Sequence, residues 1–96
     1  MKIEGDQVTF STGKKVYVNC GIIGLSPDLD VSAGYDNGWF SPTDGWHDED
    51  GIVDPQSRHY LTPAEQAELA DYMLEQWQKF KARAVHVVAV HVAIRT

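Results

Sequence analysis

The stretch LTPAEQAELADYMLEQWQKFKARA, residues 61–84, decides the fold class, because it carries the clearest helix signal in this chain of 96 residues. Thr62 is a typical cap, Pro63 suits the first helical position, and Glu65 completes a capping box with Thr62. Acidic residues come first and basic residues last, which complements the helix dipole. These signals predict a helix over residues 62–84.

One face of this helix is apolar. At about 100° per residue, six apolar side chains fall within one arc. We expect this face to cover a sheet, with Trp77 at the centre of the core. The six residues are Leu69, Ala70, Met73, Trp77, Phe80 and Ala84.

The next segment, VHVVAVHVAIR at residues 85–95, is rich in β-branched residues and lacks glycine and proline. This composition favours a strand. Both faces of such a strand would be largely apolar, so it must lie inside the sheet or pair with a second chain. The positive segment 79–96 could then meet the negative segment 16–78 of its partner, which slightly favours a homodimer through residues 85–95.

Residues 1–40 are predicted to form an antiparallel meander of three to five short strands. QVTF and KKVYVN lie on either side of a turn, as do GIIGLS and LDVSAGY. The Asp36–Asn37–Gly38 stretch gives the strongest turn signal of the chain. Together with the helix, this predicts a single α+β domain over residues 1–96, with one further C-terminal strand.

Residues 41–61, SPTDGWHDEDGIVDPQSRHYL, show neither helical nor strand periodicity. They are predicted to form an acidic loop packed on the surface. Loops longer than roughly 12–15 residues are uncommon in compact domains and are often functional.

The charge of the chain is unevenly distributed. The net charge is −6, yet residues 16–57 contain eight carboxylates and no lysine or arginine. Residues 16–78 contain twelve carboxylates and one arginine, a net charge of −11. Such a surface disfavours direct binding of nucleic acid and favours a basic protein partner.

Acidic and aromatic residues are concentrated within the sixteen residues from Tyr35 to Asp50. Aromatic side chains supply contact area at protein interfaces, and carboxylates steer a basic partner into register. The opposing interpretation is that Trp39 and Phe40 are core residues and that the acidic groups are merely solvated. The predicted partner-binding residues are Asp36, Asp44, Trp46 as the anchor, Asp48, Glu49, Asp50 and Asp54.

No motif predicts catalysis or a cofactor, so we expect a protein that is not an enzyme. An EF-hand is excluded, because a loop with Gly51 at its sixth position would begin at Trp46 and end at Ser57. Cys20 is expected to pack as a small apolar residue. An alternative remains: a divalent metal bound by Asp48, Asp50 and Asp54, or a small hydrolytic domain that also uses His47.

The chain is expected to be soluble and cytoplasmic. The N-terminal stretch MKIEGDQVTF has no apolar signal region, and no apolar run approaches a membrane span. The single cysteine rules out an internal disulfide and suits a reducing compartment.

The strings GIIGLSPDLDVSAGYD and LTPAEQAELADYMLEQWQKFKARA together resemble small acidic proteins encoded by phages and prophages. The similarity covers about residues 16–84, and the segment 85–96 departs from it. It implies a bacterial host and a function like that of anti-CRISPR inhibitors, which occupy basic nucleic-acid sites on immune complexes. The sequence thus predicts a non-enzymatic acidic inhibitor, with a metal-binding or hydrolytic domain and a self-associating structural module as alternatives.

Overall fold

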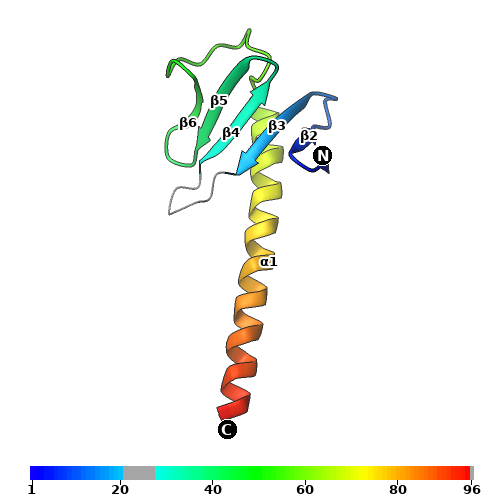
Figure 1. Cartoon of the computed structure of the whole chain (residues 1–96), viewed down its shortest axis with the longest axis vertical. Helices are drawn as coiled ribbons and strands as arrows, with labels where there is room; N and C mark the ends of the chain where they lie inside the picture. Colours follow the sequence, from blue (N-terminus) through cyan, green and yellow to red (C-terminus); the bar gives the residue numbers. More distant parts are fainter. Residues whose placement is uncertain (21–27, 96) are drawn as a thin grey trace.

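The computed structural model describes residues 1–20 and 28–95. It consists of a six-stranded antiparallel sheet in the order β1-β2-β3-β4-β5-β6, followed by one long helix (Figure 1). The predicted α+β class is confirmed, with six strands in place of three to five. The elements are β1 (Lys2–Glu4), β2 (Gln7–Thr9), β3 (Lys15–Cys20), β4 (Leu29–Ala33), β5 (Asp36–Ser41), β6 (Gly45–Asp48) and α1 (Pro63–Arg95).

The first strands follow the sequence signals closely. QVTF and KKVYVN form β2 and β3, and LDVSA forms β4. The predicted strand GIIGLS lies outside the described residues. Within the predicted loop 41–61, residues 45–48 form β6, so that interpretation was wrong for this stretch.

The predicted turn at Asn37–Gly38 is also wrong, because both residues lie inside β5. The chain turns three residues earlier, at Gly34 and Tyr35, where Ala33 pairs with Asp36. Gly34 has a φ of 64°. A two-residue hairpin turn needs such a positive φ, which glycine adopts without steric cost. Gly34 therefore supplies the positive φ of this hairpin, and the Asn-Gly pair is not needed for the turn.

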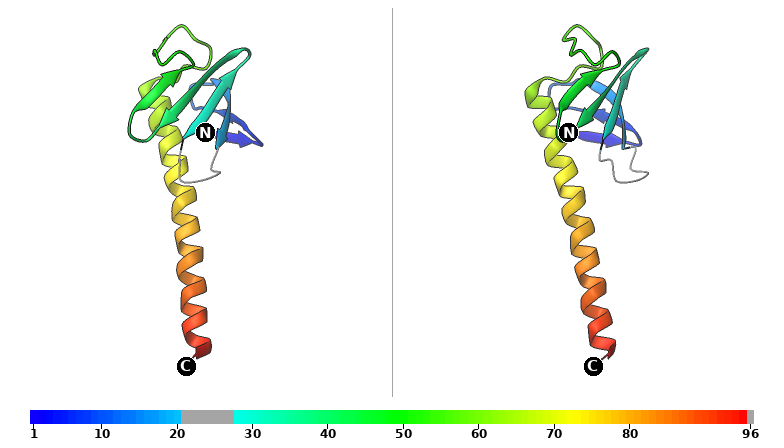
Figure 2. Two further views of the ribbon diagram at one scale, coloured as in Figure 1. Left: turned by 60° about the vertical axis from the view of Figure 1, so that its left-hand side comes forward. Right: turned by 90° about the vertical axis from the view of Figure 1, so that its left-hand side faces the viewer.

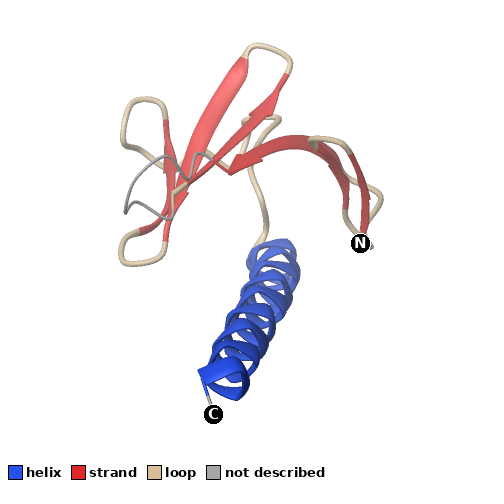
Figure 3. Ribbon diagram, turned by 60° about the horizontal axis from the view of Figure 1, so that its bottom comes forward, coloured by secondary structure: helices blue, strands red, loops and turns tan. Residues whose placement is uncertain are grey.

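The core lies between one face of the sheet and the beginning of α1, and Figures 2 and 3 show the strands gathered around that end of the helix. Alternate residues of the central strands point inward, as the pleat of a strand requires. Leu61, Leu69 and strand residues such as Val31 close this core. The buried apolar residues are Val8, Phe10, Val16, Leu29, Val31, Trp46, Leu61 and Leu69.

The start of α1 confirms the predicted capping box. The Thr62 backbone N–H donates to Glu65 Oε1 at 2.9 Å, and the Glu65 N–H donates to Thr62 Oγ1 at 3.3 Å. Glu65 also accepts a 2.6 Å hydrogen bond from the Thr12 hydroxyl in the β2–β3 connection. These bonds attach the first helical turn to the sheet.

The predicted strand at 85–95 is wrong, because α1 continues without interruption to Arg95. No glycine or proline follows Pro63, and extending a formed helix satisfies each further backbone group locally. A β-branched residue costs at most about 0.7 kcal/mol of helix propensity. Continuation of the helix therefore outweighs the strand preference of this segment.

Trp77 is not the centre of the core, contrary to the prediction. Its side chain is 47% exposed and that of Phe80 is 64% exposed. Every described side chain from Trp77 to Ala89 is exposed, so α1 projects well beyond the sheet (Figure 1). The molecule measures 60 × 26 × 21 Å. We call residues 1–76 the head and residues 77–95 the tail.

Within the described residues, no helix is both long and apolar enough to cross a membrane.

Candidate functional site: an acidic cleft

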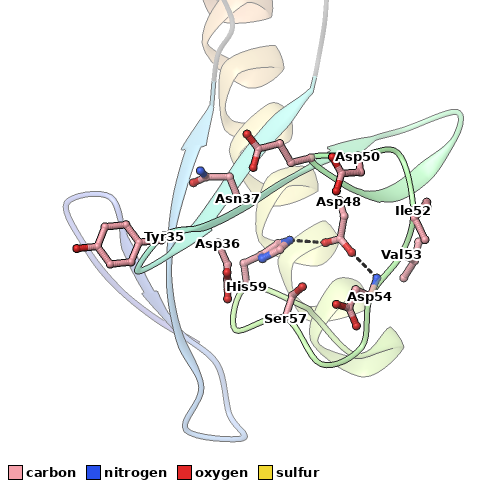
Figure 4. Close-up of a pocket in the computed structure, with 11 residues that line it drawn as sticks. Tyr35, Asp36, Asn37, Asp48, Asp50, Ile52, Val53, Asp54, Ser57 and His59 are labelled. Carbon is pink, nitrogen blue, oxygen red and sulfur yellow. Dashed lines mark hydrogen bonds and ion pairs between the residues drawn. The ribbon is translucent and has the colours of Figure 1, made fainter.

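A cleft of about 440 Å³ opens at the end of the sheet farthest from the tail (Figure 4). The β4–β5 turn, the end of β6 and the 49–59 loop form its walls. Among the described residues that line it, five are carboxylates and none is lysine or arginine. The lining residues are Tyr35, Asp36, Asn37, Asp48, Glu49, Asp50, Ile52, Val53, Asp54, Ser57 and His59.

The cleft brings together five of the seven predicted partner-binding residues: Asp36, Asp48, Glu49, Asp50 and Asp54. Segments more than ten residues apart contribute to it, because Asp36 comes from the start of β5 and the others from the end of β6 and beyond.

The structure places the other two predicted residues elsewhere. Asp44 is exposed in the β5–β6 turn, where its backbone N–H lies 3.4 Å from Ser41 Oγ. Trp46 is only 6% exposed and packs in the core. Its ring lies 5.8 Å from that of Phe40 and 5.3 Å from that of His59, measured between centroids. Trp46 therefore supports the cleft from below and is not exposed to a partner.

Three of the cleft carboxylates hold the loop in place. Asp36 Oδ2 accepts a 3.0 Å bond from the Arg58 backbone N–H, and Asp48 Oδ2 accepts one from the Asp54 N–H. Asp54 Oδ1 in turn accepts a 2.9 Å bond from the Gln56 N–H. Backbone bonds to carboxylates are the stronger, charge-assisted kind. The 49–59 loop is thus held by one carboxylate of β5, one of β6 and one of its own.

A buried pair forms the floor of the cleft. Asp48 and His59 are 7% and 2% exposed, and His59 Nε2 lies 2.5 Å from Asp48 Oδ1. The imidazole packs directly against Gly38 of β5. A Cβ atom on Gly38 would lie 2.6 Å from His59 Nε2 and 2.7 Å from the backbone oxygen of His47. Only glycine leaves room for the histidine at this position.

Two carboxylates remain without a structural role. Glu49 and Asp50 are exposed, and neither forms a hydrogen bond or ion pair with another side chain in the described part of the chain. Beside them, Ile52 and Val53 are 69% and 45% exposed. Tyr35, at the opposite rim, is 98% exposed. The rim thus combines free negative charge with accessible apolar surface.

The metal alternative is not supported by the geometry. Among residues 1–20 and 28–95, no group of three or more histidine, cysteine, aspartate or glutamate side chains is placed to hold a metal ion. Asp48, which that alternative needs as a ligand, is buried, and its two oxygens face the Asp54 N–H and His59. His47 of β6 stacks on Trp39 of β5, with 5.3 Å between the ring centroids. Asp48, Asp50 and Asp54 therefore share the cleft without being arranged as a set of metal ligands, and His47 lies outside the cleft.

The predicted partner-binding residues omitted Asn37, Ser57 and His59, which complete the cleft, and Tyr35, which was noted only as part of the acidic and aromatic stretch. Two of these residues flank Arg58, the only basic residue of the long acidic stretch. The apolar pair Ile52 and Val53 was expected to attach the loop to the core, whereas both side chains are exposed. The hydrogen bond from the Arg58 backbone N–H to the Asp36 carboxylate joins residues 22 positions apart, so no local sequence pattern predicts it.

Comparisons with known proteins add no relative: no family model matches the chain, and no curated protein or solved structure matches it. The functional argument therefore depends on the cleft and on the distribution of charge.

Proposed function

We propose that this chain is a non-enzymatic acidic binding protein that engages a basic, nucleic-acid-handling partner through the acidic cleft. One observation carries the proposal: five carboxylates line a single cleft whose described lining contains no lysine or arginine. A guanidinium or ammonium group entering this cleft would form charge-assisted hydrogen bonds. Arginine is the better fit, since its planar fork can bind two carboxylate oxygens at once.

The division of roles among the carboxylates supports a protein partner. Asp36, Asp48 and Asp54 keep the loop rigid, so Glu49 and Asp50 can bind a cation without the cost of ordering the loop. The exposed Ile52 and Val53 supply apolar contact area that a free cation would not need. The combination fits a basic protein surface with apolar patches.

A nucleic-acid-handling partner follows from the same chemistry. A surface that binds phosphate must be basic, and a rigid acidic protein can occupy it in place of the nucleic acid. Inhibition of this type, in the cytoplasm of a bacterial host, is the function that the resemblance to phage-encoded inhibitors implies. The acidic cleft supports this proposal as a surface that a basic partner could contact.

The free carboxylates give the sharpest test. Replacing Glu49→Gln together with Asp50→Asn removes two charges from the rim without touching the bonds that order the loop. We expect association with an immobilised arginine-rich peptide to slow about two- to tenfold at low salt, because rim charges act mainly on the on-rate. The difference should vanish at about 0.5 M salt, where charges are screened.

The matched control is Glu4→Gln with Asp6→Asn, which makes the same change of charge in the β1–β2 hairpin. Equal on-rates for the cleft variant and the wild type at low salt would contradict the proposal, as would an equal effect of the control. The wild-type chain should also capture a basic protein from bacterial lysate, and added oligonucleotide should release that protein.

A further inference from the structure

The tail carries a surface that the acidic cleft does not explain. Large apolar side chains are exposed along it: Phe80 is 64% exposed, Val87 59% and Val88 62%. A soluble monomer rarely exposes a contiguous apolar patch of this kind. In proteins, most of the stability of a helix also comes from packing its apolar face against other residues. A second protein surface packed against the tail would bury this apolar patch and stabilise the helix.

The spacing of these residues is that of a helix that pairs with another helix. From residue 70 to residue 87, apolar residues recur in alternating steps of three and four. This 3–4 repeat is the heptad pattern of coiled coils, in which each apolar side chain enters a gap in the facing helix. We call this set the heptad stripe: Ala70, Met73, Trp77, Phe80, Ala84 and Val87.

The charges of α1 select the partner and its direction. Helix residues 63–78 carry four carboxylates and no basic residue, whereas residues 79–95 carry four basic residues and no carboxylate. Two copies in parallel would place like charges side by side. Two copies running antiparallel would place the acidic half of each beside the basic half of the other, which is favourable.

The head offers a place for the end of the second helix. An apolar groove of about 310 Å³ lies where Phe40 of β5 and Pro42 of the β5–β6 turn face Ala70, Leu74 and Trp77 of α1. This groove adjoins the acidic half of the helix. In an antiparallel pair, the basic, valine-rich half of the second copy reaches this level.

We propose that two copies of this chain pair through α1 in antiparallel orientation, with the heptad stripes in contact and the tail of each copy beside the groove of the other. Centring the pair between Trp77 and Phe80 places Trp77 against the second copy's Phe80. Met73 then meets the second copy's Ala84, and Ala70 meets its Val87. Large residues oppose small ones on both sides of the centre, so the helices can approach closely.

The mass of the protein in solution tests the pairing. Sedimentation equilibrium between about 1 and 200 µM should show twice the monomer mass for the wild type. The double variant Phe80→Glu with Val87→Glu should be monomeric throughout, because two charges per chain would be buried in the interface. Gln78→Glu with Ala82→Glu adds the same charge on the opposite face of the helix and should leave the dimer intact.

Disulfide formation tests the direction, in a Cys20→Ser background. Oxidised Val87→Cys alone should give no cross-linked dimer, since antiparallel pairing separates the two positions by roughly 25 Å at 1.5 Å per residue. An equal mixture of Ala70→Cys and Val87→Cys chains should cross-link. A monomeric wild type at every concentration would overturn the proposal. Efficient cross-linking of Val87→Cys alone would overturn the antiparallel arrangement.

Discussion

Gly38 determines how closely the 49–59 loop can approach the sheet. Gly38→Ala would place a Cβ atom 2.7 Å from the backbone oxygen of His47, which cannot move without disturbing β6. We expect a loss of about 1–3 kcal/mol in the free energy of unfolding, as for other overpacked sites. Urea denaturation followed by circular dichroism measures this loss. Asn37→Ala, an exposed neighbour on the same strand, should change the stability by less than about 0.5 kcal/mol. A Gly38→Ala variant as stable as the wild type would contradict the close packing of His59 and of the His47 backbone against Gly38.

At this scale the sequence predicted the carboxylates well and the aromatic anchor poorly. Five predicted acidic residues line the cleft, because the stretch is so acidic that any loop built from it gathers carboxylates. Trp46 was assigned to the surface because of its acidic neighbours. The alternation of β6 turns both Trp46 and Asp48 inward, and that strand has only four residues. Its pattern is too short to distinguish from a loop.

Among the elements, the junction between α1 and the β2–β3 connection should depend on pH through Glu65. Burial raises the pKa of Glu65, but hydrogen bonds from Thr12 and Thr62 and the charge of Lys14 outweigh it and hold this pKa below 4.5. A carboxyl whose pKa is lower in the folded state stabilises the fold above the unfolded pKa. That contribution is lost as pH falls through the folded pKa.

Glu65→Gln should therefore cost about 1 kcal/mol at pH 7, because the charge-assisted bonds become neutral ones. The gap to the wild type should narrow as the pH is lowered below about 4.5, which thermal unfolding at a series of pH values would measure. Glu68 contributes in the same direction, so some acid sensitivity should remain in the variant. Desolvation raises the pKa of Glu68, but hydrogen bonds from the N-terminal amino group and Ser11 outweigh it, so the net effect is a lowered pKa. As a control, Glu75→Gln, whose exposed carboxylate pairs with Lys79, should change the free energy of unfolding at pH 7 by less than about 0.5 kcal/mol.

The helix was predictable at its start and not at its end. The capping box is a local signal, and its two hydrogen bonds form as expected. The end of the helix depends on which structure, strand or helix, can provide hydrogen-bond partners for the backbone N–H and C=O groups. A strand at 85–95 would need a free sheet edge beside it, whereas a helix needs only its own preceding turn. Residue propensities, which differ by less than about 1 kcal/mol each, do not contain that information.

On the scale of the whole molecule, the head and the tail are built from separate sets of residues. Among the described residues, the eight buried apolar residues of the core lie at or before Leu69, and those that line the acidic cleft lie before residue 60. The described side chains of the tail, residues 77–89, contribute charge and exposed apolar surface but no core residue. Partner binding by the cleft and pairing through α1 should therefore be separable.

A chain shortened to residues 1–76 tests this separation. We expect it to keep the β-sheet signal in circular dichroism and to bind the arginine-rich peptide with the same affinity per chain as the full chain. Its melting temperature should not change with protein concentration. That of the full chain should rise with concentration, because association stabilises only the folded state. The two melting temperatures should converge at the lowest concentrations, where the full chain dissociates. A shortened chain that is unfolded at every concentration would mean that the head depends on the tail for its stability. The cleft would then have to be studied in the intact dimer.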